Sequence, residues 1–111
     1  MAQYSASLDD VFLTLADPTR RAVVGALGHG PASVGELAQS ASMTLPSFMK
    51  HVHRLERCGL IRTTKSGRVR TCTLNRRRLS VVDGWLAEQR AVWESRTERL
   101  EQFVANTEER S

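Results

Sequence analysis

Features that define several other protein classes are scarce or missing in these 111 residues. Two cysteines are too few for a disulfide scaffold or for a zinc site with four thiolates. No apolar run approaches the roughly 20 residues that span a bilayer, and the first residues lack the basic stretch and apolar core of a secretory signal. No internal repeat and no linker rich in Pro, Gly or Ser divides the chain. We therefore expect a single domain, residues 1–111, in the cytoplasm and without a membrane partner.

The chain also lacks a recognisable set of catalytic or metal-binding residues. Neither a Ser/His/Asp or Cys/His set nor a glycine-rich phosphate loop can be read from it. The histidines His29, His51 and His53 are scattered, and the last two project about 200° apart on one helix. A transition-metal site needs several converging ligands, so we expect no metal. Because no catalytic set and no phosphate loop can be read, we also expect no enzyme activity and no cofactor.

Positive charge is concentrated in one third of the chain. Residues 42–78 contain ten Lys or Arg and one Glu, a net charge of +9, whereas the segments before and after carry −2 and −3. Such a block is typical of a surface for a polyanion, because each neutralised phosphate releases condensed counterions. Charge alone leaves open a solvated basic face without a partner.

Apolar spacing and capping residues predict four helices within about the first 58 residues. In order, they cover about 8–16, 18–27, 34–40 and 45–58. Asp17, Ser33 and Thr44 are candidate N-caps, and Glu36 completes a capping box with Ser33. Gly59 ends the fourth helix, as a left-handed residue commonly does.

The fourth helix has one apolar and one polar face. Phe48, Val52 and Leu55 fall on a single stripe that we expect to be buried. The side chains directed away from this stripe are polar or basic: Ser47, Lys50, His53, Arg54 and Arg57.

After this helix, the period of the residue pattern changes to two, which is typical of a strand. Two runs rich in β-branched residues, about 60–65 and 68–74, flank Ser66 and Gly67, which predicts a two-residue hairpin. This register opposes Lys65 to Arg68 and Ile61 to Cys72. Like charges at a hairpin tip destabilise it slightly, and a nearby anion would relieve that repulsion.

A long helix follows from about residue 79 to 105. Its apolar side chains exceed what the remaining core of a small domain can cover: Val82, Leu86, Trp93, Leu100 and Phe103. The simplest use for this surplus apolar surface is a partner subunit.

Together these elements predict a mainly α fold with a small β-hairpin, a winged helix-turn-helix with a long C-terminal helix. The helix-turn-helix covers about 33–58 and the wing about 60–74. A major groove about 12 Å wide accepts one helix, while the hairpin lies against adjacent backbone. The expected contacts to base edges or phosphates come from Ser47, Lys50 and Arg54, and those of the wing from Lys65, Arg68 and Arg70.

Three motifs resemble the ArsR-type bacterial transcriptional regulators. Residues 44–61, TLPSFMKHVHRLERCGLI, resemble the family's recognition helix and wing start, S-x-P-x-x-x-K-H-L-x-x-L-x-x-x-G-L-[IV]. Residues 15–21, LADPTRR, resemble its L-x-[DS]-P-T-R entry into the second helix, and residues 67–70, GRVR, resemble its wing tip. The resemblance covers about residues 8–86, with the motifs in the family's order.

This resemblance implies a homodimeric repressor that binds double-stranded DNA at an operator with inverted half-sites. Thr44, which opens the first motif, joins the candidate DNA contacts. His51 matches a family position near the DNA backbone, although a packed histidine is the alternative. The terminal helices would form the dimer interface through Leu8, Val11, Phe12, Leu86, Trp93, Leu100 and Phe103.

The chain departs from the metal-sensing members of this family. Their third helix carries a C-x-C motif, whereas residues 34–39 here read VGELAQ. Residues 79–111 contain neither the His nor the Cys that other members' terminal-helix sites require. The resemblance therefore implies the branch without metal sites.

Two alternatives remain at this point. Cys58 and Cys72 could form a redox switch that distorts the wing, although two small apolar residues in a reducing cytosol explain them more simply. The winged-helix shape could also serve as a protein-interaction module, which would have little need for the outward cations.

Overall fold

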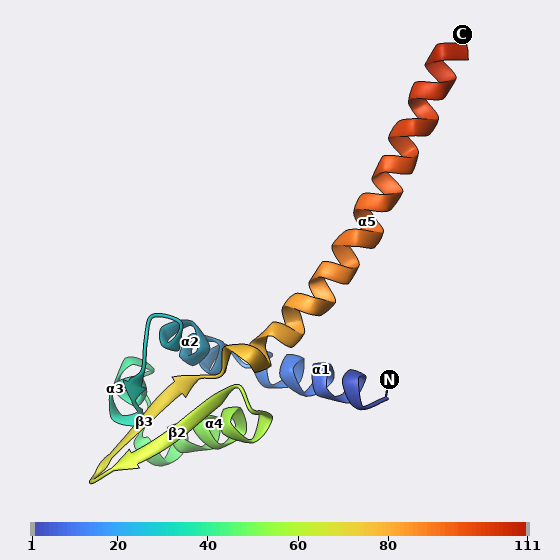
Figure 1. Ribbon diagram of the computed structural model, residues 1–111. Coiled ribbons are helices and arrows are strands. Elements are labelled where there is room, and N and C mark those ends of the chain that lie inside the picture. The colour runs from blue at the N-terminus through green and yellow to red at the C-terminus, as the bar shows by residue number, and fades with distance from the viewer. Residues whose placement is uncertain (1, 111) are drawn as a thin grey trace. The chain divides into compact units, whose positions relative to one another are not determined.

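A computed structural model of the chain describes the backbone of residues 2–110 and the side chains of residues 7–108. Helices account for most of these residues, and three short strands among them form one sheet (Figure 1). The elements are α1 (Ala2–Leu15), α2 (Pro18–Leu27), β1 (Ala32–Ser33), α3 (Val34–Ser40), α4 (Leu45–Cys58), β2 (Ile61–Ser66), β3 (Val69–Leu74) and α5 (Arg76–Arg110). Two compact units divide the chain, residues 1–80 and residues 81–111. The predicted fold class, mainly α with a winged helix-turn-helix, is confirmed.

Three helices begin where side chains cap them. The Asp17 carboxylate accepts the backbone N–H of Arg20 at 3.0 Å, and the Ser33 hydroxyl accepts that of Glu36 at 3.1 Å. Thr44 Oγ1 caps the first turn of α4 in the same way, at 3.4 Å. Each cap satisfies a donor that has no partner inside its helix. These three predicted boundaries are therefore confirmed, whereas α1 begins earlier than predicted.

Two arginines of α2 hold the end of α1. Arg20 Nε donates to the carbonyl oxygen of Thr14 at 2.6 Å. Arg21 Nη1 donates to the carbonyl oxygens of Leu15 and Ala16 at 2.9 and 3.0 Å. The last carbonyls of a helix lack intrahelical partners and carry its negative dipole end, so the guanidinium groups satisfy them and join α1 to α2.

The core of the first unit is built around α4. Phe48, Val52 and Leu55 are fully buried, which confirms the predicted apolar stripe. Leu8 and Val11 of α1 are also buried, with 8% and 0% of their surface exposed. The prediction that these two side chains face a partner subunit is corrected accordingly, because they have almost no surface left to offer one.

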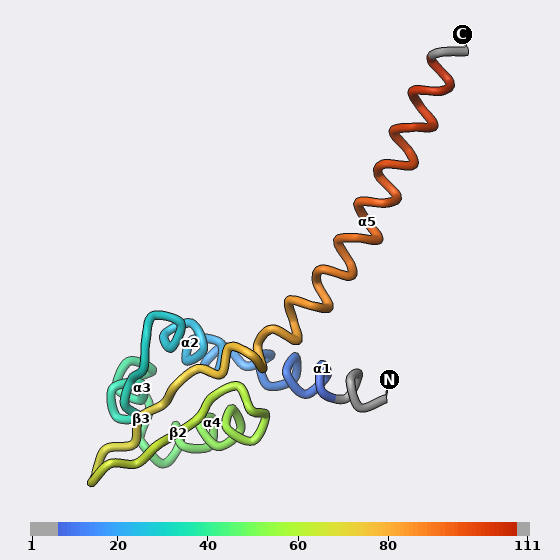
Figure 2. Tube along the Cα trace, in the orientation of Figure 1, coloured from blue at the N-terminus to red at the C-terminus, as the bar shows by residue number. Residues whose placement is uncertain are grey.

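The sheet has the strand order β1-β3-β2, with all strands antiparallel. β1 was not predicted, because two residues are too short for a recognisable period. Ala32 pairs with Cys72 and Ser33 with Thr71, so β1 ties the start of α3 to the hairpin. The trace in Figure 2 follows the hairpin from the end of α4 out to its tip and back.

The hairpin register differs from the predicted one. Lys65 pairs with Arg70 rather than with Arg68, and Ile61 pairs with Leu74 rather than with Cys72, which lies opposite Thr63. The loop is Gly67–Arg68, and only its first residue has a positive φ, +63° for Gly67. Glycine at the first loop position suits a type II′ turn. Like charges still oppose each other near the tip, but the pair is Lys65 and Arg70.

The helix α5 starts three residues before the predicted position and continues to Arg110. Its residues from 81 onward form the second unit. Six large apolar side chains of this unit are exposed: Leu86, Val92, Trp93, Leu100, Phe103 and Val104.

Candidate nucleic-acid interface

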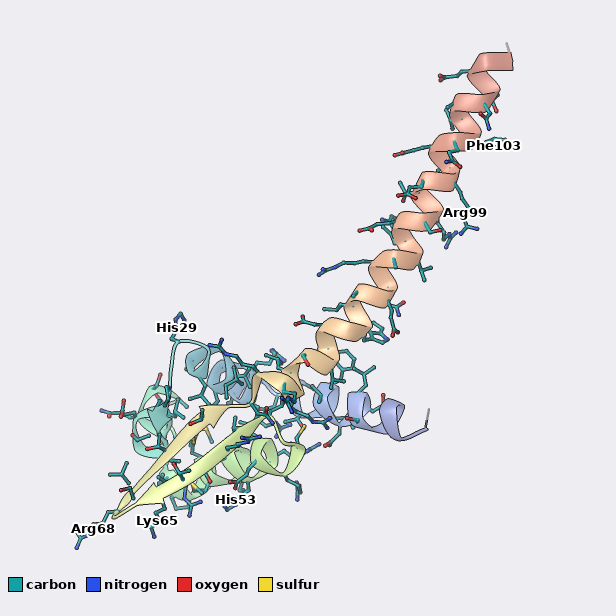
Figure 3. All side chains as sticks on the ribbon, in the orientation of Figure 1. His29, His53, Lys65, Arg68, Arg99 and Phe103 are labelled. Atoms are coloured by element: carbon teal, nitrogen blue, oxygen red, sulfur yellow. The ribbon has the colours of Figure 1, made fainter. Side chains whose placement is uncertain are left out.

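The outward face of α4 begins with exposed polar side chains. Ser47 and Lys50 are both exposed and lie about one helical turn apart. Thr44 is exposed as well, but its hydroxyl is used as the helix cap. His53 projects from the same helix (Figure 3). The first half of α4 therefore presents a hydroxyl and an ammonium group to solvent, as the sequence predicted.

Arg54 does not point freely away from the core, in contrast to the prediction. Its Nη2 donates to Asp10 Oδ1 of α1 at 2.9 Å, and only 22% of its side chain is exposed. Partial burial raises the pKa of Asp10, but the hydrogen bond and charge of Arg54, with smaller contributions from Cys58 and Arg78, lower it below 3.8. Arg54 thus binds α4 to α1.

Arg78 extends this contact and was missed by the sequence reasoning. Its Nε donates to the carbonyl oxygen of Cys58 at 2.8 Å, and its Nη1 donates to the hydroxyl of Ser7. Its Nη2 lies 3.9 Å from Asp10 Oδ2. One guanidinium group therefore joins α1, the end of α4 and the start of α5 inside the first unit. The only signal was a third arginine in the run at 76–78.

His51 lies between the two roles that the sequence left open. Its side chain is 20% exposed, and its Nδ1 lies 3.7 Å from Asp17 Oδ2, the N-cap of α2. Within the described part of the chain, this buried nitrogen has no hydrogen-bond partner. The pKa of Asp17 is lowered, mainly by the hydrogen bond from the Arg20 backbone N–H. Partial burial raises this pKa, and the charge of His51 lowers it further. His51 is therefore a largely packed side chain on the flank of α4.

The hairpin carries the three basic side chains predicted for the wing, besides the exposed Arg62. Lys65 and Arg68 are exposed and lie at the tip (Figure 3). Arg70 is partly buried, and its Nη1 donates to Thr63 Oγ1 at 3.3 Å, which in turn donates to Glu56 Oε2 at 2.5 Å. This chain of hydrogen bonds links β3 through β2 to α4. It was not predicted, because the helical period of α4 carries no information about the strands that follow it.

The two cysteines are free and buried. Burial raises the pKa of the Cys72 thiol, and the nearby charge of Glu56 raises it further. Since the thiolate is the reactive form, these surroundings make Cys72 a poor redox sensor. The apolar interpretation of both residues is the better supported one.

Among the residues described, no group of three or more His, Cys, Asp or Glu is placed to hold a metal ion. None of the described helices combines the length and the apolar character that crossing a membrane requires.

Comparisons with known proteins agree on one family. A helix-turn-helix domain family matches residues 15–64. A transcriptional regulator, HTH-type regulator Rv2034 of Mycobacterium tuberculosis, is 38% identical over 69 residues, 62% of this chain and 64% of that protein. The transcriptional repressor SdpR of Bacillus subtilis is 27% identical over 79 residues, 71% of this chain and 88% of that protein. The chain thus spans less than two thirds of the length of Rv2034.

A solved structure matches most of the chain. It is the crystal structure of an ArsR family transcriptional regulator, 58% identical and with a TM-score of 0.78. The match covers 86% of this chain and 98% of that one. These relatives are transcriptional regulators rather than enzymes. With this identity over nearly the whole of a solved member, the chain belongs to the ArsR family of transcriptional regulators.

Proposed function

We propose that the chain is a sequence-specific DNA-binding repressor, acting as a homodimer on an operator with inverted half-sites in the bacterial cytoplasm. The observation that carries this proposal is the pairing of two exposed features. Ser47 and Lys50 stand on the first half of α4, and the exposed Lys65 and Arg68 lie on the hairpin beside the partly buried Arg70. The name of the repressor SdpR supports repression rather than activation.

In this proposal α4 enters the major groove with its first half. Ser47 and Lys50 contact base edges or the phosphates beside them, because a recognition helix reads bases through its N-terminal residues. Thr44 and His51 lie beside the DNA backbone. Arg54 supports α4 through Asp10 instead of reading a base.

The wing contributes affinity without sequence information. Lys65, Arg68 and Arg70 contact backbone phosphates, and each neutralised phosphate releases counterions whatever the base sequence is. Binding should therefore weaken steeply with salt.

The second unit supplies the dimer contact. Leu86, Trp93 and Leu100 are spaced by seven residues, which keeps them on one side of a supercoiled helix pair. Phe103 lies three residues beyond Leu100, on the neighbouring seam position. Phe12 of α1, 40% exposed, is the remaining candidate from the first helix.

The test is fluorescence anisotropy with DNA flanking the protein's own gene, compared with scrambled DNA over a salt series. We expect specific binding at least about 10³-fold tighter than binding to scrambled DNA. Lys50→Ala should cost about 1–3 kcal/mol on the operator alone, whereas Arg68→Ala should weaken binding to both DNAs and reduce the salt slope by about one. Arg90→Ala, which removes an exposed charge from α5, is the matched control.

Two outcomes contradict the proposal. Weak binding that is equal on both DNAs would favour an interaction module with a winged-helix shape. Operator binding that is lost under oxidant would favour the redox-responsive repressor, against the burial of Cys58 and Cys72.

A further inference from the structure

A groove in the first unit lies between the starts of α3 and α4 and the tip of the hairpin. Its volume is about 360 Å³, near the lower end of the range for small-ligand sites. Its lining combines two chemistries, the cations Lys65, Arg68 and Arg70 with the apolar side chains of Leu45 and Met49. No metal ligand and no acidic side chain is among the residues that line it.

The cations face the groove because of the hairpin register. Lys65 and Arg70 are directly opposite each other and share a face with Thr63, since alternate strand residues point the same way. Thr63 bonds Glu56 of α4, so this face of the hairpin looks toward α4. Like charges held opposite each other repel, and an anion between them would convert this repulsion into attraction.

DNA binding alone leaves the apolar wall unexplained. Leu45 is 51% exposed and, with Met49, lies beside the three cations. A phosphodiester neutralises the cations but buries little hydrocarbon. A carboxylate on a short hydrocarbon chain uses both walls, because its head pairs with the cations and its chain removes apolar surface from water.

We propose that this groove binds a monocarboxylate with a short hydrocarbon chain. The carboxylate lies between Lys65 and Arg70 and within reach of Arg68, and the chain lies along Leu45 and Met49. The ligand would occupy the cations that the proposed function assigns to operator phosphates, and would therefore release DNA by direct competition. Release rests on the proposed function, whereas binding of the acid does not.

Binding is tested without DNA, by NMR titration of the isotope-labelled full chain. The probes are octanoate and hexanoate, with acetate as a head without a chain and hexanamide as a chain without a charge. Each buried methylene tightens binding by up to about fourfold. We expect octanoate to bind at least about tenfold more tightly than acetate, hexanamide to bind more weakly than hexanoate, and the shifts to fall on residues 33–35, 45–49 and 65–70.

One variant from each wall separates their contributions. Leu45→Ser removes an apolar contact on α4 and keeps every charge, and Lys65→Ala removes one cation from the hairpin. Arg62→Ala is the matched control, since Arg62 is exposed on the same strand but on its other face. We expect each groove variant to weaken octanoate binding by about threefold or more, and the control to change it by less than about twofold.

Two results would overturn the proposed site. One is equal affinity for octanoate and acetate, and the other is a set of shifts confined to the apolar side of α5. Operator binding measured with and without octanoate then tests release. We expect octanoate to raise the protein concentration at which half of the operator is bound, the midpoint of DNA binding. Octanoate that binds the groove and leaves that midpoint unchanged would overturn release. A chain that binds no operator without octanoate would refute the proposed function instead, while the NMR titration still decides the ligand site.

Discussion

Replacing Asp10 by Asn tests whether Arg54 supports α4 from within the protein. Asp10 Oδ1 accepts a hydrogen bond from Arg54 Nη2 at 2.9 Å, and Asp10 Oδ2 lies 3.9 Å from Arg78 Nη2. Asn keeps the size of the side chain but removes its charge. The two guanidinium groups then lose the anion that holds α4 and the start of α5 against α1.

The expected loss follows from the exposure of the partners. The side chains of Arg54 and Arg78 are 22% and 21% exposed, and that of Asp10 is 40% exposed. Exposed ion pairs contribute about 0.2–1 kcal/mol, whereas removing one partner of a fully buried pair costs about 3–5 kcal/mol. We expect Asp10→Asn to lower the free energy of unfolding by about 1–2 kcal/mol, and a coupling of about 1 kcal/mol with Arg54→Gln.

The pH dependence gives this prediction a second test. The pKa of Asp10 is lower in the folded protein than its ordinary value of 3.8. A depressed carboxylate pKa contributes stability that is present above the unfolded value and is lost as pH falls through the folded one. The coupling between Asp10 and Arg54 should therefore be constant near neutral pH and decline below about pH 4.

Urea unfolding of the parent, both single variants and the double variant measures this coupling. The protein concentration is held fixed, because self-association would shift apparent stability. Operator affinity is measured in parallel. A coupling below about 0.3 kcal/mol, together with a more than tenfold loss of operator affinity in Arg54→Gln alone, would refute the supporting role and restore Arg54 as a DNA contact.

Three further predictions concern the first unit. Arg20→Ala should lower the free energy of unfolding by about 1–2 kcal/mol, because the Thr14 carbonyl oxygen loses its donor; an unchanged urea midpoint would contradict this. Gly59→Ala should lower the free energy of unfolding by about 1–2 kcal/mol, because a φ of +88° is unfavourable for a residue with a Cβ. The loss would not come from a clash, since the nearest atom of Arg78 would lie 3.6 Å from the added Cβ. A raised thermal midpoint would disprove the conformational argument. Burial raises the pKa of the Cys72 thiol, so iodoacetamide should label native Cys72 far more slowly than urea-unfolded protein, and equal rates would show that the thiol is accessible.

Helix boundaries could be predicted because their causes are local. Asp17, Ser33 and Thr44 bond backbone donors three residues away. The left-handed Gly59 likewise follows directly from its place at the end of an apolar period. Such contacts depend on the neighbouring sequence alone, so the pattern of residue types is sufficient.

The candidate site was only partly predictable, because some of its contacts join distant segments. Arg54 was assigned to solvent from a helical wheel, which carries no information about Asp10, 44 residues earlier. The hairpin register was ambiguous because Gly67 suits either position of a two-residue loop. That choice decides which side chain faces Lys65, and so determines the charge pair in the groove.

The strand β2 has a further consequence for handling the protein. Within the described residues, it is paired along one edge only, since β3 lies between it and β1. An unpaired edge can add a strand from another chain, and charged side chains discourage this. Arg62 and Lys65 flank the two adjacent, β-prone threonines of this strand. Lys65, which the proposed function assigns to a phosphate, therefore also opposes aggregation. A variant that loses both Lys65 and Arg62 would leave this edge free to pair with a strand of another chain.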